Sequence, residues 1–214
     1  MLTTEQQTAI AEKLASMHLP SGLGDEENAC SIAAINLALT GELTDKIPDC
    51  MSEVIGRWII GIQDSMPDEM RNSPQWKSLL PLAAGTGREK EKERLAIILE
   101  WMWGTVLPTL QPLADEKGFG AEWERMTTER TEEAARAAWA AAAMAAMADA
   151  ALWAMADAAL WATTDAAFVA LALGHVARAA AAWSAAIRAA AASAEAEAWK
   201  TFNPCGLLER LIRA

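Results

Sequence analysis

Cysteine is the residue type in this chain most able to do covalent chemistry, and Cys50 follows two acidic residues, Asp45 and Asp49. With Cys30 upstream, this group suggests either a thiolate nucleophile or a metal site. A nucleophilic thiolate needs a base within reach, and the nearby sequence supplies none. We therefore expect Cys30 and Cys50 to be small buried side chains. A thiol-dependent enzyme or a small-ligand binder centred on Cys30, Asp45 and Cys50 is the alternative.

The metal-binding potential of the chain is low. His18 and His175 are its only histidines, and no Cys-x-x-Cys or His-x-x-x-His pair occurs, so we expect no metal site and no cofactor. The third cysteine, Cys205, makes the number odd and the spacing wide, which is unlike a disulfide framework. The first residues lack the pattern of a signal peptide, and a cytoplasmic location is expected.

The loop at residues 85–88, Gly-Thr-Gly-Arg, has two readings. Its backbone amides could hold a phosphate at the start of a helix. It lacks the spacing and the lysine of a phosphate-binding loop, so a plain turn is the preferred interpretation.

The charge of the chain argues against nucleic-acid binding. The net charge is −11, of which −8 falls in residues 1–120 and −3 in residues 121–214. An acidic surface repels phosphate backbones and anionic lipid. The opposite reading, an acidic decoy for a nucleic-acid-binding protein, is a further alternative. Because acids are mixed with Lys and Arg, ordinary surface solvation is the simpler explanation.

Residues 1–120 are expected to form an acidic head of short helices. Thr3 or Thr4 with a following glutamine predicts a capping box and a helix to about residue 17. A second helix is expected from the acidic residues 25–27 to Gly41, and a third after Pro48. Ser65 and Ser73 predict further starts, and the charged residues 88–94 predict a solvated helix start.

Residues 121–214 are expected to form an alanine-rich helical arm with a short C-terminal helix. Between residues 134 and 198, 36 of 65 residues are alanine, the best helix former. A straight helix of this length is unlike a compact protein, so we expect a hairpin or small bundle that turns at Gly174 or at Thr163-Thr164. The uncharged runs are too short for a transmembrane helix.

The arm carries large side chains on several sides. Asp149 to Trp153 repeats as Asp157 to Trp161, and eight residues advance a helix by about 80°. The tryptophans therefore point in several directions and need cover from several directions. This predicts a homo-oligomer or a complex with a host protein. The candidate interaction residues are Trp139, Trp153, Trp161 and Trp183.

Residues 24–103 resemble a family of uncharacterised bacterial and bacteriophage proteins. Relatives often have histidine or serine just before the equivalent of Asp45, where this chain has Leu43-Thr44. The resemblance assigns no activity; it implies a head that carries different tails, in a protein that a phage encodes. It rests on residues 30–34 (Cys-Ser-Ile-Ala-Ala), Gly41, Thr44-Asp45, residues 48–50 (Pro-Asp-Cys), Asp64, Pro67-Asp68, Leu82 and Gly85-Thr86.

Together these patterns predict an all-α protein with a short-helix head and a helical arm. The expected function is that of a non-enzymatic interaction or assembly protein, which acts by self-association or by binding a host protein.

Overall fold

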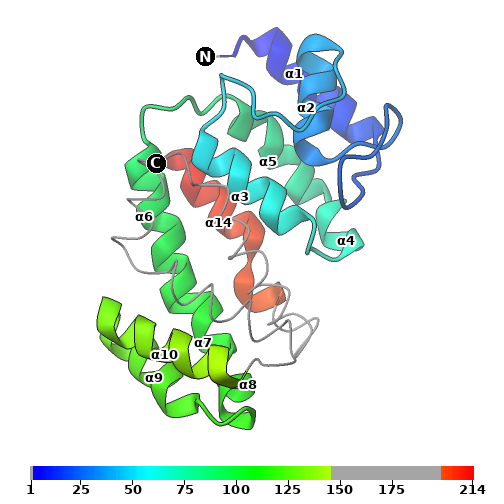
Figure 1. Cartoon of the computed structure of the whole chain (residues 1–214). Coiled ribbons are helices and arrows are strands. Elements are labelled where there is room, and N and C mark those ends of the chain that lie inside the picture. The colour runs from blue at the N-terminus through cyan, green and yellow to red at the C-terminus, as the bar shows by residue number, and fades with distance from the viewer. Residues whose placement is uncertain (1, 146–198) are drawn as a thin grey trace. The chain divides into compact units, whose positions relative to one another are not determined.

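The computed structural model describes residues 2–145 and 199–214 (Figure 1). Their regular elements are all helices, and one isolated bridge between Gly24 and Ala29 is the only β pairing within these ranges. The all-α fold is thereby confirmed. Within the same ranges, no helix is both long and apolar enough to cross a bilayer. The expected turns and three of the four candidate tryptophans lie outside the described residues: Gly174, Thr163-Thr164, Trp153, Trp161 and Trp183.

The chain divides into two compact units. Unit 1 consists of Met1–Arg94 and Pro204–Ala214, and unit 2 is Leu95–Asn203. The chain thus leaves unit 1 within one helix and returns to it for its last residues. The division into a head and an arm at residue 120 concerns folding domains, and it remains a prediction.

Unit 1 is a set of helices around an apolar core. α1 packs on α2 and α5, and α14 packs on α5 and α3. The helices of this unit are α1 (Thr4–Ser16), α2 (Ser31–Thr40), α3 (Glu53–Gln63), α4 (Asp68–Arg71), α5 (Pro74–Ala84), the first turn of α6 (Glu91–Trp101) and α14 (Pro204–Arg213). Among the largest fully buried side chains of unit 1 are Ile10, Leu14, Leu19, Ile32, Ile35, Met51, Ile55, Ile59, Ile62 and Trp76.

Local capping chemistry sets several of the helix ends. Thr3 and Gln6 form the expected capping box at α1. Ser73 caps α5 with proline following it, as expected. Gly41 ends α2 in the left-handed conformation, with φ of 76°, and its N–H donates to the Leu37 carbonyl.

The expected start of the second helix was wrong. α2 begins at Ser31, because Asp25 forms a turn instead of opening a helix. Its carboxylate Oδ1 accepts the N–H groups of Glu27 at 2.9 Å and of Asn28 at 2.8 Å. A carboxylate that bonds to the two amides ahead of it competes with helix formation.

The charged residues 88–94 do not all face solvent, which corrects a second expectation. α6 begins at Glu91, whose carboxylate accepts the Ser52 hydroxyl at 2.8 Å and the Glu53 N–H at 2.8 Å. Glu91 therefore satisfies the N-terminus of α3, where the helix dipole favours an anion. Arg94 is only 3% exposed.

A second buried arginine, Arg71, ties three segments of unit 1 together. Its side chain is 7% exposed, and its guanidinium donates to the carbonyls of Leu19 at 2.6 Å and Met66 at 2.7 Å. It also donates to the Gln63 carbonyl at 3.2 Å and to Asp68 at 2.9 Å. Arg71 thus satisfies carbonyls at the end of α3 and in the segment after α1, where no helix supplies a donor.

The described part of unit 2 is also helical. Trp123 is fully buried and donates its indole N–H to the Leu107 carbonyl at 2.9 Å. Trp101 donates in the same way to the Phe202 carbonyl at 2.9 Å. The elements are the rest of α6, the π-helix η1 (Met102–Val106), α7 (Leu107–Thr109), α8 (Gln111–Glu116), α9 (Gly120–Glu129), α10 (Glu132–Ala145) and a helical turn at residues 199–202.

Candidate functional site

Cys30 lies at the N-cap position of α2. Its Sγ accepts a hydrogen bond from the Ala33 N–H at 3.4 Å, and its own N–H donates to the Leu23 carbonyl at 3.0 Å. The residue is 5% exposed. This sulfur therefore caps the N-terminus of α2, as a serine or threonine oxygen does in many helices.

The structure brings Cys30 and Asp45 to one small cavity, together with Asp64 and Gln63. Cys50 is not among the residues that line it. The cavity has a volume of about 40 Å³, which admits water and is far below the roughly 300 Å³ of a small-molecule site. Asp64 and Gln63 come from the end of α3, so no local sequence pattern could have joined them to Cys30.

The electrostatics of this cavity keep the Cys30 thiol protonated. Burial raises the pKa of Cys30 most, and the negative charges of Asp45 and Asp64 raise it further. The N–H groups of Ala33 and Ile32 lower the pKa but do not outweigh burial. A reactive thiol needs the opposite balance, a depressed pKa in an electropositive setting. The arrangement suits a structural cap better than a nucleophile.

The other two cysteines lie elsewhere in unit 1. Cys50 is half-buried in the turn before α3, and its carbonyl accepts the Gly87 N–H at 2.9 Å. Burial raises the pKa of Cys50, and Asp49 adds to the shift. Cys205 is buried on α14, where burial and Glu209 raise its pKa. All three thiols are free.

Substitution of Cys30 is expected to separate its structural role from a chemical one. Cys30→Ala removes the cap and should lower the free energy of unfolding by about 1 kcal/mol. Cys30→Ser keeps an acceptor at the cap and should lose less. Urea unfolding of both variants measures the difference.

A pH dependence follows from the raised pKa of Cys30. The folded state holds the proton more tightly, so the thiol of the unfolded chain ionises first, near its ordinary pKa of 9.0. The unfolding free energy of the wild type should therefore fall above that pH, and less steeply in Cys30→Ser. Equal slopes, or rapid modification of Cys30 by a thiol reagent at neutral pH, would contradict a buried, protonated cap.

A larger cavity of about 350 Å³ lies beside the first and shares Asp45 and Ile60 with it. Arg88 forms ion pairs with Asp49 at 3.4 Å and with Glu53 at 3.5 Å, so these charges are paired with one another within the cavity wall. Arg57 likewise pairs with Glu53 at 2.9 Å. Three acidic and three basic side chains line this cavity, so it has no net charge to attract a ligand: Asp45, Asp49, Glu53, Lys46, Arg57 and Arg88.

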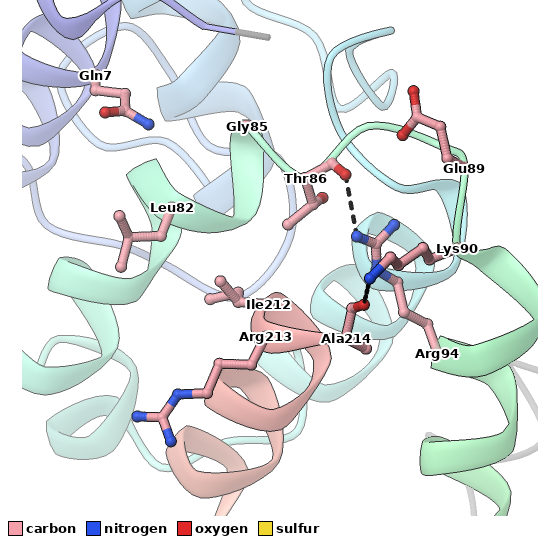
Figure 2. A pocket seen from close by; sticks show the side chains of 10 residues that line it. All are labelled: Gln7, Leu82, Gly85, Thr86, Glu89, Lys90, Arg94, Ile212, Arg213 and Ala214. Carbon is pink, nitrogen blue, oxygen red and sulfur yellow. Dashed lines mark hydrogen bonds between the residues drawn. The ribbon is translucent and has the colours of Figure 1, made fainter.

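The loop after α5 is a turn whose amides are already used. Gly85 donates to the Leu82 carbonyl at 3.2 Å, and Thr86 donates to the Ala83 carbonyl at 3.2 Å. Gly87 donates to Cys50, as described above. These three amides therefore do not face a phosphate. The same loop forms one wall of a cavity of about 370 Å³, which is lined mainly by side chains (Figure 2).

Trp139 is the one candidate interaction tryptophan within the described residues, and it lies on α10. It is 37% exposed, and Met144 on the same helix is 79% exposed. Sequence reasoning did not single out Met144, because a methionine among alanines is equally consistent with a buried and with an exposed position. The inner face of α10 is made of fully buried alanines: Ala134, Ala135, Ala138 and Ala142.

No family model, curated protein or solved structure matches this chain. Within the described residues, no group of three or more His, Cys, Asp or Glu side chains is arranged to hold a metal ion.

Proposed function

We propose that the protein is a non-enzymatic interaction protein, and that it associates with a second copy of itself through the outer face of α10. The observation that carries the proposal is the exposure of Trp139 and Met144 on a helix whose inner face is alanine. Contact surfaces in soluble proteins are built from exposed apolar side chains. Tryptophan and methionine are also enriched at such surfaces.

The geometry of α10 favours a helix as the binding partner. At 100° per residue, Trp139 and Met144 lie about 140° apart and border the outer arc of the helix. Ala140 and Ala143 fall between them, and Ala140 is exposed. One turn earlier on the same arc lies Arg136, which pairs with Glu132. The two alanines, which we call the strip, lie between two large side chains, so another helix can approach closely at this level of α10, with the large side chains packing at its flanks. A second copy of α10 offers the same strip and the same flanks, as a two-fold interface requires.

The cysteine chemistry supports the non-enzymatic reading. Cys30 is a buried cap with a raised pKa, and its cavity is too small for an organic substrate. The thiol enzyme centred on Cys30, Asp45 and Cys50 stays an untested alternative. It would require Cys50 at a cavity that it does not line.

The test is the mass of exposed-face variants in solution. Trp139→Glu and Ala140→Glu each place a charge on the strip, so both should shift the full chain from dimer towards monomer. The expected rise in the dissociation constant is about tenfold or more, because association would bury the added carboxylate at the contact. Helicity by circular dichroism should stay unchanged, since glutamate is a good helix former.

Ala11→Glu is the matched control, because Ala11 is an exposed alanine on α1. It should leave the dimer intact. If Ala11→Glu dissociates the dimer as much as Ala140→Glu does, added charge alone is the cause. If neither strip variant changes the mass of a wild-type dimer, the contact lies elsewhere on the chain. A host protein as the partner would appear instead as a wild-type monomer.

A further inference from the structure

The cavity of about 370 Å³ beside the loop after α5 combines a buried charge with exposed apolar surface (Figure 2). It lies wholly within unit 1, between the α5–α6 loop and the end of α14. Its walls are Gln7, Leu82, Gly85, Thr86, Glu89, Lys90, Arg94, Ile212, Arg213 and Ala214.

Arg94 is the fixed charge of this cavity. The residue is 3% exposed, and its guanidinium donates to three carbonyls: Leu211 at 3.2 Å, Gly87 at 2.8 Å and Thr86 at 3.0 Å. A guanidinium carries more than three N–H donors, so some remain for another acceptor. Within the described residues no carboxylate forms an ion pair with Arg94, although buried charges are ordinarily paired.

Lys90 adds a second cation on the same side. Its ammonium donates to the main-chain oxygen of Ala214, and it too has donors to spare. In Figure 2, Lys90 and Arg94 lie together, whereas the carboxylate of Glu89 and the guanidinium of Arg213 point away from them. Two cationic side chains, Lys90 and Arg94, therefore lie together at this end of the cavity, on a chain whose net charge is −11.

The opposite side of the cavity carries two apolar side chains as well as Gln7 and Arg213 (Figure 2). Leu82 is 48% exposed, which makes it one of few large apolar side chains left uncovered in the described residues. Ile212 lies near it on α14 (Figure 2). The volume is within the range of small-molecule sites.

We propose that this cavity binds a small organic anion, with a carboxylate or phosphate head at Arg94 and Lys90 and a short apolar body against Leu82 and Ile212. The anion supplies the counter-charge that Arg94 lacks, and arginine suits planar or tetrahedral oxyanions because its N–H groups are forked. The body covers Leu82. The amides of the loop take no part, since they already donate to carbonyls.

Isothermal titration of the full-length protein tests the proposal with four probes. Hexanoate and hexyl phosphate carry both parts, hexylamine reverses the charge, and inorganic phosphate lacks the body. At least one of the first two should bind with one-to-one stoichiometry and a Kd of about 1 mM or tighter. Which of them binds more tightly distinguishes a carboxylate from a phosphate head. Hexylamine should not bind, and inorganic phosphate should bind at least tenfold more weakly.

Variants locate the binding. Leu82→Asp places a negative charge, of the same sign as the anion, in the cavity. Lys90→Gln removes one of the two cations. Both residues are exposed, so both variants should fold. Each should weaken binding about tenfold. Leu23→Asp is the matched control, because Leu23 is a similarly exposed leucine, at 42%, outside this cavity. The proposal is overturned by no saturable binding of either amphiphilic anion, by equal binding of hexylamine, or by wild-type affinity in Leu82→Asp and Lys90→Gln. If inorganic phosphate binds as tightly as hexyl phosphate, the proposed contact of an apolar body with Leu82 and Ile212 is overturned.

Discussion

Replacing Arg71 with methionine is expected to lower the free energy of unfolding by about 3–5 kcal/mol. Methionine keeps much of the apolar length of the side chain and removes every donor. The Met66 carbonyl would then lose its donor within the protein. The Leu19 carbonyl would keep only the Asn72 side chain at 3.1 Å, and the Gln63 carbonyl only the Met66 N–H at 3.2 Å. An unsatisfied buried carbonyl costs about 1–3 kcal/mol, so the effects add to a large fraction of the stability of a small domain.

Urea denaturation with circular dichroism measures this loss as a lower midpoint. Arg57→Met is the matched control, because Arg57 is 41% exposed and makes one ion pair, with Glu53 on its own helix. It should cost well under about 1 kcal/mol. Equal losses in the two variants would mean that Arg71 does not hold the three segments together.

Replacing Leu208 with alanine is the second change with a large expected effect. Leu208 lies on α14, is fully buried, and belongs to unit 1 although more than a hundred residues separate α14 from the rest of that unit. Truncation of a buried leucine to alanine costs about 2–5 kcal/mol, depending on how far the cavity collapses. Because α14 packs on α5 and α3, the loss should spread to those helices.

Hydrogen exchange resolved by segment checks where the Leu208→Ala effect falls. Faster exchange is expected in α3, α5 and α14, which share one core. Arg210→Ala, at an exposed position two residues on, should leave these rates close to those of the wild type. Loosening of α14 alone, with α3 and α5 unchanged, would contradict a common core.

Much of the fold of unit 1 follows from local sequence. Thr3 with Gln6, Ser73 with Pro74, and Gly41 each predict a helix end, because the group that satisfies the backbone lies within a few residues of it. The all-α class follows from the same signals. Asp25 shows the limit of such reasoning, since an acidic residue favours a turn and a helix start about equally from sequence alone.

The roles of the buried arginines could not be predicted in the same way. Arg94 sits in a run of alternating charges that reads as a solvated helix start, yet its acceptors include Leu211, over a hundred residues away. Arg71 likewise binds the carbonyl of Leu19 across the fold. Such partners depend on tertiary packing, which no local pattern encodes. For the candidate site, sequence identified Cys30 and Asp45 but not Asp64, which joins them only when α3 packs beside α2.

Sedimentation equilibrium of the full-length wild-type protein over a wide concentration range tests the proposed self-association most directly. Self-association predicts a mass that rises from the 22.9 kDa of one chain to twice that value as concentration increases. It also predicts that Trp139→Glu moves this rise to higher concentration. A wild-type mass that stays at one chain at the highest concentration would contradict association through α10.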